Sequence, residues 1–292
     1  MTMKKIIFSL LIILSLGQVM QAQDAKTGMI EISKVSQPCV IAQYAMPASI
    51  IEGAWKKKCT DAKLPSADKT KDGFKVYKGV VIPEITKDRI DVYVRIEDNK
   101  TSTTFYMLTS KGYDNFLKTE TDAIAIDNTI NYLTAFAKDA TIFQYNLDLE
   151  KQQDVLKGLS RKESNAIRTG ESLVKDKQKT ESKISKNEIE MRAFNAEMEA
   201  QQKLLELTKT KTATIDGVDA LKKEISKQES LVRKITKSYN NAIEDGVTYK
   251  ENLKKIEGKI VDNEQEQEKI KADLVIENAK LADINEKLNA LK

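Results

Sequence analysis

Histidine is absent from the sequence, and glycine and proline are scarce, with 11 and 4 among 292 residues. Without histidine the chain has no imidazole base and no imidazole metal ligand, which removes a large share of hydrolase and zinc chemistry. No nucleophile–base pair, phosphate loop or metal-ligand motif stands out, and Asp91 and Glu97 read as exposed strand residues. We therefore expect no catalytic, cofactor-binding or metal-binding residues, and we predict that the protein is not an enzyme.

Cysteine is also scarce, with two residues, Cys39 and Cys59. An oxidising compartment would favour a disulfide between them, and both could lie toward one end of a strand–helix pair. Two buried free thiols are the alternative. Redox chemistry is disfavoured because the spacing is not a CxxC motif. Cys39 and Cys59 are therefore the disulfide candidate.

Neither large part of the chain has a strong excess of charge of one sign. Residues 24–118 carry 16 basic and 12 acidic side chains, and residues 119–292 carry 30 and 32. Nucleic-acid binding needs a concentrated basic field, which neither part has. We expect no nucleic-acid partner.

A long apolar run is found at the N-terminus alone. Lys4 and Lys5 precede 11 apolar-rich residues, Ile6 to Leu16, and a polar stretch with small residues follows. This is the layout of a secretory signal peptide, and the run is short for a spanning helix. We predict cleavage near Ala22–Gln23. The mature chain is then expected to have no transmembrane segment and to be located in the periplasm or outside the cell. An uncleaved anchor is the alternative.

Residues 24–118 have the pattern of a small α+β head. Residues 39–46 are expected to form a buried strand, and Pro47 then opens an amphipathic helix. Three alternating strands follow, near residues 74–82, 90–97 and 104–109. The order β-α-β-β-β predicts an antiparallel sheet with one helix on one face. The lysine run at 56–58 is read as a solvated helix face, with an anionic-ligand patch as the alternative.

Residues 119–292 contain no proline and carry a heptad pattern. One frame runs unbroken from Val218 to Leu291, and 17 of its 22 seam positions are apolar. A frame from Ile142 to Thr208 has 12 apolar seam positions of 20. Such frames indicate a coiled coil. A kink near Gly158 is an alternative to one continuous first helix.

Before Ile142 the apolar stripe lies on another side of the predicted helix. Its members are Ile126, Ile130, Leu133, Ala137, Ala140 and Leu147. The same region is rich in aromatic residues, whereas the rest of the coiled coil has few. We infer that the start of this helix packs on the head.

The segment TKTKTATIDGV, residues 208–218, separates the two heptad frames. The frames are out of register across it, threonines lower helix propensity, and Asp-Gly favours a turn. We predict an antiparallel coiled-coil hairpin with helices at about 121–208 and 218–292, pairing residues whose numbers sum to roughly 425. The candidate tip residues are Thr210, Thr212, Thr214, Asp216 and Gly217.

This architecture favours a non-enzymatic, exported coiled-coil protein that acts as a scaffold or binds a protein partner, with homo-oligomers as a further option. One alternative is a periplasmic holdase chaperone, which the layout resembles in architecture: a signal peptide, a small body and helical arms. Another is an envelope adaptor whose hairpin tip docks a partner. The sequence does not identify the partner.

Overall fold

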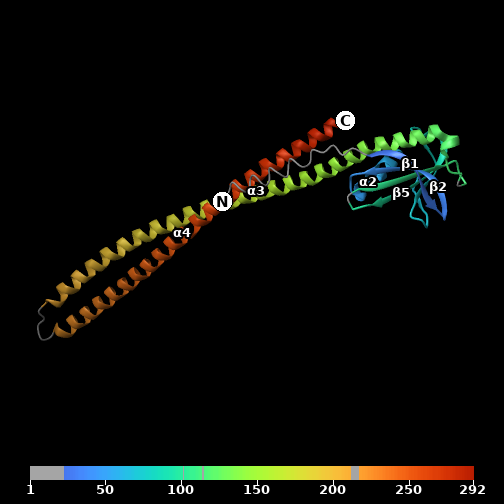
Figure 1. Ribbon diagram of the computed structural model, residues 1–292. Helices are drawn as coiled ribbons and strands as arrows, with labels where there is room; N and C mark the ends of the chain where they lie inside the picture. Colours follow the sequence, from blue (N-terminus) through green and yellow to red (C-terminus); the bar gives the residue numbers. More distant parts are fainter. Residues whose placement is uncertain (1–22, 101, 114, 212–216) are drawn as a thin grey trace. The chain divides into compact units, whose positions relative to one another are not determined.

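The computed structural model describes residues 23–100, 102–113, 115–211 and 217–292 (Figure 1). The predicted signal peptide lies outside these residues, apart from Gln23. The chain divides into two compact units. Among the described residues, one unit consists of those up to Gln153 together with Lys280–Lys292, and the other of those between Asp154 and Ala279.

The head contains a six-stranded antiparallel sheet in the order β1-β2-β6-β5-β4-β3. Its elements are β1 (Gln23–Ile32), β2 (Val35–Tyr44), α2 (Ala48–Asp61), β3 (Asp68–Lys69), β4 (Lys75–Ile82), β5 (Thr86–Asp98) and β6 (Thr103–Ser110). The predicted α+β head, with one helix between the strands of an antiparallel sheet, is confirmed. Strands β1 and β3 were not predicted. β1 joins β2 through Ser33 and Lys34, which adopt positive φ angles of 49° and 66° without the usual Asn-Gly signature of such a turn.

The sheet separates two hydrophobic cores. The first core joins the sheet to the helices and includes Trp55, Cys59 and Phe105. The second consists of strand and loop residues, among them Cys39 and Phe74. The expected Cys39–Cys59 disulfide is therefore corrected: both cysteines are buried free thiols that belong to different cores.

Trp55 is the centre of the first core. Its ring meets those of Tyr77, Phe105, Tyr132 and Phe136 edge-on, with centroids 5.3–6.4 Å apart. Its Nε1 donates a hydrogen bond to the Tyr77 hydroxyl at 3.1 Å. Because these rings come from α2, the sheet and the following helix, one side chain ties three elements together.

Helix α3 (Thr119–Lys209) begins on the head, as predicted. Its residues Ile126, Leu133, Phe136 and Ala140 belong to the first core. The Tyr44 hydroxyl also donates to the Leu133 carbonyl at 2.7 Å. The start of α3 is therefore an integral part of the head.

The second long helix, α4, spans Val218–Ala290. At the hairpin turn, α3 ends and α4 begins within one residue of the predicted positions. Residues around Gly158 are helical, so the alternative of a kink there was wrong. Within the described ranges, none of the helices is both long and apolar enough to cross a bilayer.

Asp122 fixes the first turn of α3, where its own backbone angles are non-helical (φ −129°, ψ 33°). Its carboxylate pairs with the Lys111 ammonium and accepts hydrogen bonds from the Thr121 hydroxyl and the Lys118 amide. These donors, Lys111 above all, lower the pKa of the Asp122 carboxyl to about 2.

Removing the bulk of Trp55 should destabilise the head. We expect Trp55→Ala to lower the free energy of unfolding by about 3–5 kcal/mol, because it leaves a cavity among four rings. Trp55→Phe keeps an aromatic ring and should cost less, chiefly the hydrogen bond to Tyr77, at about 1 kcal/mol. Urea unfolding followed by near-UV circular dichroism measures both, and equal costs would contradict a central packing role.

The Asp122 contacts should make the stability of the head depend on pH in the acidic range. The pKa of this carboxyl is lower in the folded chain than its unfolded value of about 3.9, so the charged form stabilises the fold. This contribution is complete above roughly pH 4 and is lost as the pH falls through about 2. The difference in melting temperature between the wild type and Asp122→Asn should therefore shrink on acidification, and a constant difference would refute the assignment.

Candidate functional site

The two heptad frames form the seam of the helical hairpin. Every predicted seam position of α3 from Ile142 to Thr208 is buried or half-buried, as is every one of α4 from Leu221 to Leu291. Val218, the first position of the α4 frame, is 39% exposed at the end of its helix. The charged seam residue Lys177 has a partner across the helices, since its ammonium lies 2.9 Å from the Glu257 carboxylate. Apart from Val218, the predicted frames and the antiparallel pairing within Asp154–Ala279 are therefore confirmed.

The register of the pairing differs from the prediction by about one helical turn. A sum of 425 would have placed Asn187 opposite Ser238, but its side chain bonds to Ala242. Likewise, the predicted pairing placed Asn263 beside Lys162 and Glu163, but its side chain donates to the Ala166 carbonyl. Heptad frames repeat every seven residues, so they define the faces that meet but not the levels at which they meet.

One polar contact in the seam joins Asn187 of α3 to α4. Asn187 is 5% exposed, and its Nδ2 donates to the Ala242 carbonyl at 2.9 Å. A side chain at Gly246 would place its Cβ 2.6 Å from the Asn187 Oδ1. Asn187 therefore occupies the space that any larger residue at 246 would need.

A second contact repeats this arrangement with the helices exchanged. Asn263 and Gln267 of α4 donate to the Ala166 carbonyl of α3 at 3.1 and 3.4 Å. A Cβ at Gly170 would lie 2.7 Å from the Asn263 Oδ1. Each contact thus combines an alanine carbonyl, a glycine four residues later and an amide from the other helix.

The glycine makes each alanine carbonyl accessible. A helix side chain tilts toward the N-terminus and lies over the preceding turn, where it would cover that carbonyl. With glycine at that position, the carbonyl keeps its helical hydrogen bond and can accept a second from the facing helix. Gly170 and Gly246 are two of the non-apolar positions in the predicted frames. The alanine–glycine spacing, together with asparagine in the facing frame, was the signal that could have revealed the contacts.

Gly246 also opens a groove of about 610 Å³ on one side of the hairpin. Its apolar lining comes from Met191, Ala196, Tyr239, Ile243 and Val247. Its polar lining comes from Asn187, Glu188, Arg192, Asn195, Glu199 and Lys250. Ile243 and Val247 lie one turn apart on α4 and are 38% and 54% exposed. Apolar side chains beside charges of both signs are the composition of a protein-contact surface.

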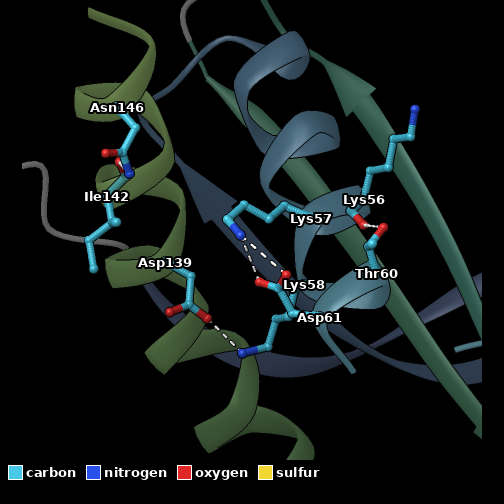
Figure 2. A network of polar contacts seen from close by, with 8 residues as sticks. All are labelled: Lys56, Lys57, Lys58, Thr60, Asp61, Asp139, Ile142 and Asn146. Carbon is cyan, nitrogen blue, oxygen red and sulfur yellow. Dashed lines mark hydrogen bonds and ion pairs between the residues drawn. The ribbon is translucent and has the colours of Figure 1, made fainter. Parts of the chain in front are cut away.

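Two lysines of the α2 run, Lys57 and Lys58, are paired with carboxylates (Figure 2). Lys57 pairs with Asp61 one turn later, and Lys58 reaches Asp139 of α3 at 2.6 Å. Lys58 also lies over the Tyr132 ring at 4.8 Å. These contacts favour a structural role for Lys57 and Lys58 over an anionic-ligand patch.

The titratable groups buried in the head are core residues. Burial raises the pKa of the Cys39 thiol to about 11 and raises the pKa values of Cys59, Tyr44 and Tyr132 as well. A raised thiol pKa keeps the group protonated and weakly nucleophilic at neutral pH.

The two carboxylates considered from the sequence have local partners. Asp91 accepts from the Gly79 amide at 2.7 Å, and Glu97 pairs with Arg95. In the part of the chain that the structure describes, no group of three or more cysteine, aspartate and glutamate side chains is placed to hold a metal ion.

The predicted tip residues are only partly described. Thr210 follows the end of α3, and its hydroxyl donates to the Leu207 carbonyl at 2.9 Å. Gly217 precedes the first residue of α4. Thr212, Thr214 and Asp216 lie outside the described residues, so the tip stays a prediction as a binding site.

Comparisons with known proteins leave the family open. No protein-family model matches the chain, and no curated protein matches it significantly.

Glycine-to-alanine substitutions should have different effects on stability at the polar contacts and at ordinary helix positions. Gly258→Ala, on α4 with nothing near the added Cβ, should stabilise the chain by about 0.5–1 kcal/mol through helix propensity. Gly246→Ala should forfeit this gain and fall below Gly258→Ala by about 1–3 kcal/mol, since it displaces the Asn187 amide from its buried hydrogen bond. Thermal unfolding followed by far-UV circular dichroism compares the two, and equal gains would show that the contact contributes nothing.

Proposed function

We propose that this is a non-enzymatic, exported coiled-coil protein that works as a scaffold or partner-binding module, with the hairpin as its binding element. The observation that carries the proposal is the groove beside Gly246, where Ile243 and Val247 are exposed next to Tyr239 and Met191. Exposed apolar side chains that gather in one groove are typical of a protein-binding surface.

The polar contacts in the seam support the same role. Helix pairing held by Asn187 and Asn263 at particular carbonyls gives the hairpin one register, so the groove has a constant shape. A pre-organised surface binds with a smaller entropy loss than one that orders on contact. Export is proposed from the leader-like N-terminus, and the groove favours hairpin-face binding over the chaperone and tip-adaptor alternatives.

Partner capture in cells tests the proposal. Chemical cross-linking of intact cells, followed by recovery of the chain from the envelope and secreted fractions, should yield a specific cross-linked protein. Ile243→Asp should reduce this capture about tenfold, because it places a charge in the desolvated centre of the contact.

Ile276→Asp is the matched control. Ile276 lies on the same helix, is 43% exposed against 38% for Ile243, and is not among the groove residues. Capture that survives Ile243→Asp, or falls equally in both variants, would move the binding site away from the groove. Unchanged far-UV circular dichroism would show that both variants keep their helices.

A further inference from the structure

The solvent side of α4 carries a second, mixed pattern along the face that holds the groove. Two positions of each heptad face this side, and from Ile243 to Val275 they are all exposed. In order, they are Ile243, Val247, Lys250, Lys254, Glu257, Val261, Glu264, Glu268, Lys271 and Val275. The three valines recur at 14-residue intervals, or two heptads, and are 54%, 50% and 71% exposed. The spacing within the pattern alternates between three and four residues, as in the seam of a coiled coil.

This pattern is complementary to its own reverse. When two copies of α4 are set antiparallel about the level of Lys259, Ile243 meets Val275, Lys250 meets Glu268, and Lys254 meets Glu264. Val247 meets Lys271, and Glu257 meets Val261. The two-fold symmetry repeats every pair, so ten layers contain four opposite-charge pairs, two apolar pairs and no like-charge pair.

From this arrangement we infer that the hairpin face is an interface for a second copy of this chain, which docks with its α4 antiparallel to the first. The face covers the 33 residues from Ile243 to Val275, which is about 48 Å of helix at a rise of 1.5 Å per residue. A partner must therefore supply a long heptad-repeat helix with the same charge order reversed, and this chain supplies one. The inference rests on the proposed function only in taking the hairpin as a protein-binding element.

Two further features suit close approach at this face. Gly258 lies near the symmetry level, and an added Cβ there would meet nothing within 4 Å. On α3, Ile167 and Val174 occupy the corresponding heptad positions and are 43% and 46% exposed, so they widen the apolar part of the same face. Valines opposite Lys271 and Glu257 can pack against the methylene stems of those side chains.

Ion pairs already present within the hairpin do not block this docking. Lys250 lies 3.6 Å from Glu188, and both side chains are more than 40% exposed. Lys271 lies 2.9 Å from Glu268 on the same helix, and both are more than half exposed. Exposed pairs of this kind contribute little stability and can exchange partners.

Charge reversal at one contact pair tests the interface. Sedimentation equilibrium of the full chain should show a monomer–dimer equilibrium. Lys254→Glu and Glu264→Lys should each raise the dimer dissociation constant about tenfold, because each sets two like-charge pairs across the interface. Mixing the two singly substituted chains should restore dimers, since both contacts between positions 254 and 264 in the mixed dimer then join a carboxylate to an ammonium.

Lys255→Glu is the matched control, with the same charge change at the next residue, outside the face pattern. It should leave the dissociation constant unchanged. A chain that stays monomeric at all concentrations overturns the inference, as does a dimer that ignores the reversals or whose mixed variants fail to recover. A monomer that still captures another protein at the groove would leave the proposed function standing while removing the second copy as its partner.

Discussion

The hairpin depends on one constraint: its two helices share a single seam, so a polar side chain buried there can find a partner only on its own helix or on the facing one, and Gln228 Oε1 finds none among the described residues. A larger bundle could turn a polar residue toward another neighbour or bury it in a different layer. Here, the side-chain amides of Asn187 and Asn263 each donate a hydrogen bond to an alanine carbonyl of the facing helix. A glycine four residues after each alanine makes that carbonyl accessible. Unpaired, such buried groups would cost more than the pairs contribute, so the contacts select one register over its neighbours.

The head is held together differently, because one large side chain joins three of its elements. Trp55 brings α2, the sheet and the start of α3 into a common aromatic core. Gly53 lets α2 approach α3 closely, because a Cβ there would lie 2.6 Å from the Phe143 ring. The beginning of the long helix is therefore held by the head core, and the polar anchor at Asp122 fixes where it starts.

These two arrangements leave different surfaces for function. The buried titratable groups of the head pack in its hydrophobic cores. Lys57 and Lys58 of α2 are paired with nearby carboxylates. The hairpin, in contrast, uses one face of each helix for its seam and leaves the other faces to solvent. Apolar side chains on those faces, in a groove beside Gly246 and along α4, make protein contact the function best supported by the geometry.

Sequence periodicity determined the features that depend on neighbours along the chain. Both heptad frames, the helix ends at the hairpin turn and the packing of early α3 on the head follow from local patterns, because a helix presents the same face every seven residues. Other features needed distant residues. The exact level of pairing came from asparagine–carbonyl contacts between residues 55 and 97 positions apart. The separation of Cys39 from Cys59 came from the sheet that lies between the two cores. β1 was hidden because its turn lacks the usual residues, and its pairing with β2 defines it. Patterns along a chain specify which face is buried, whereas only tertiary contacts specify what that face meets.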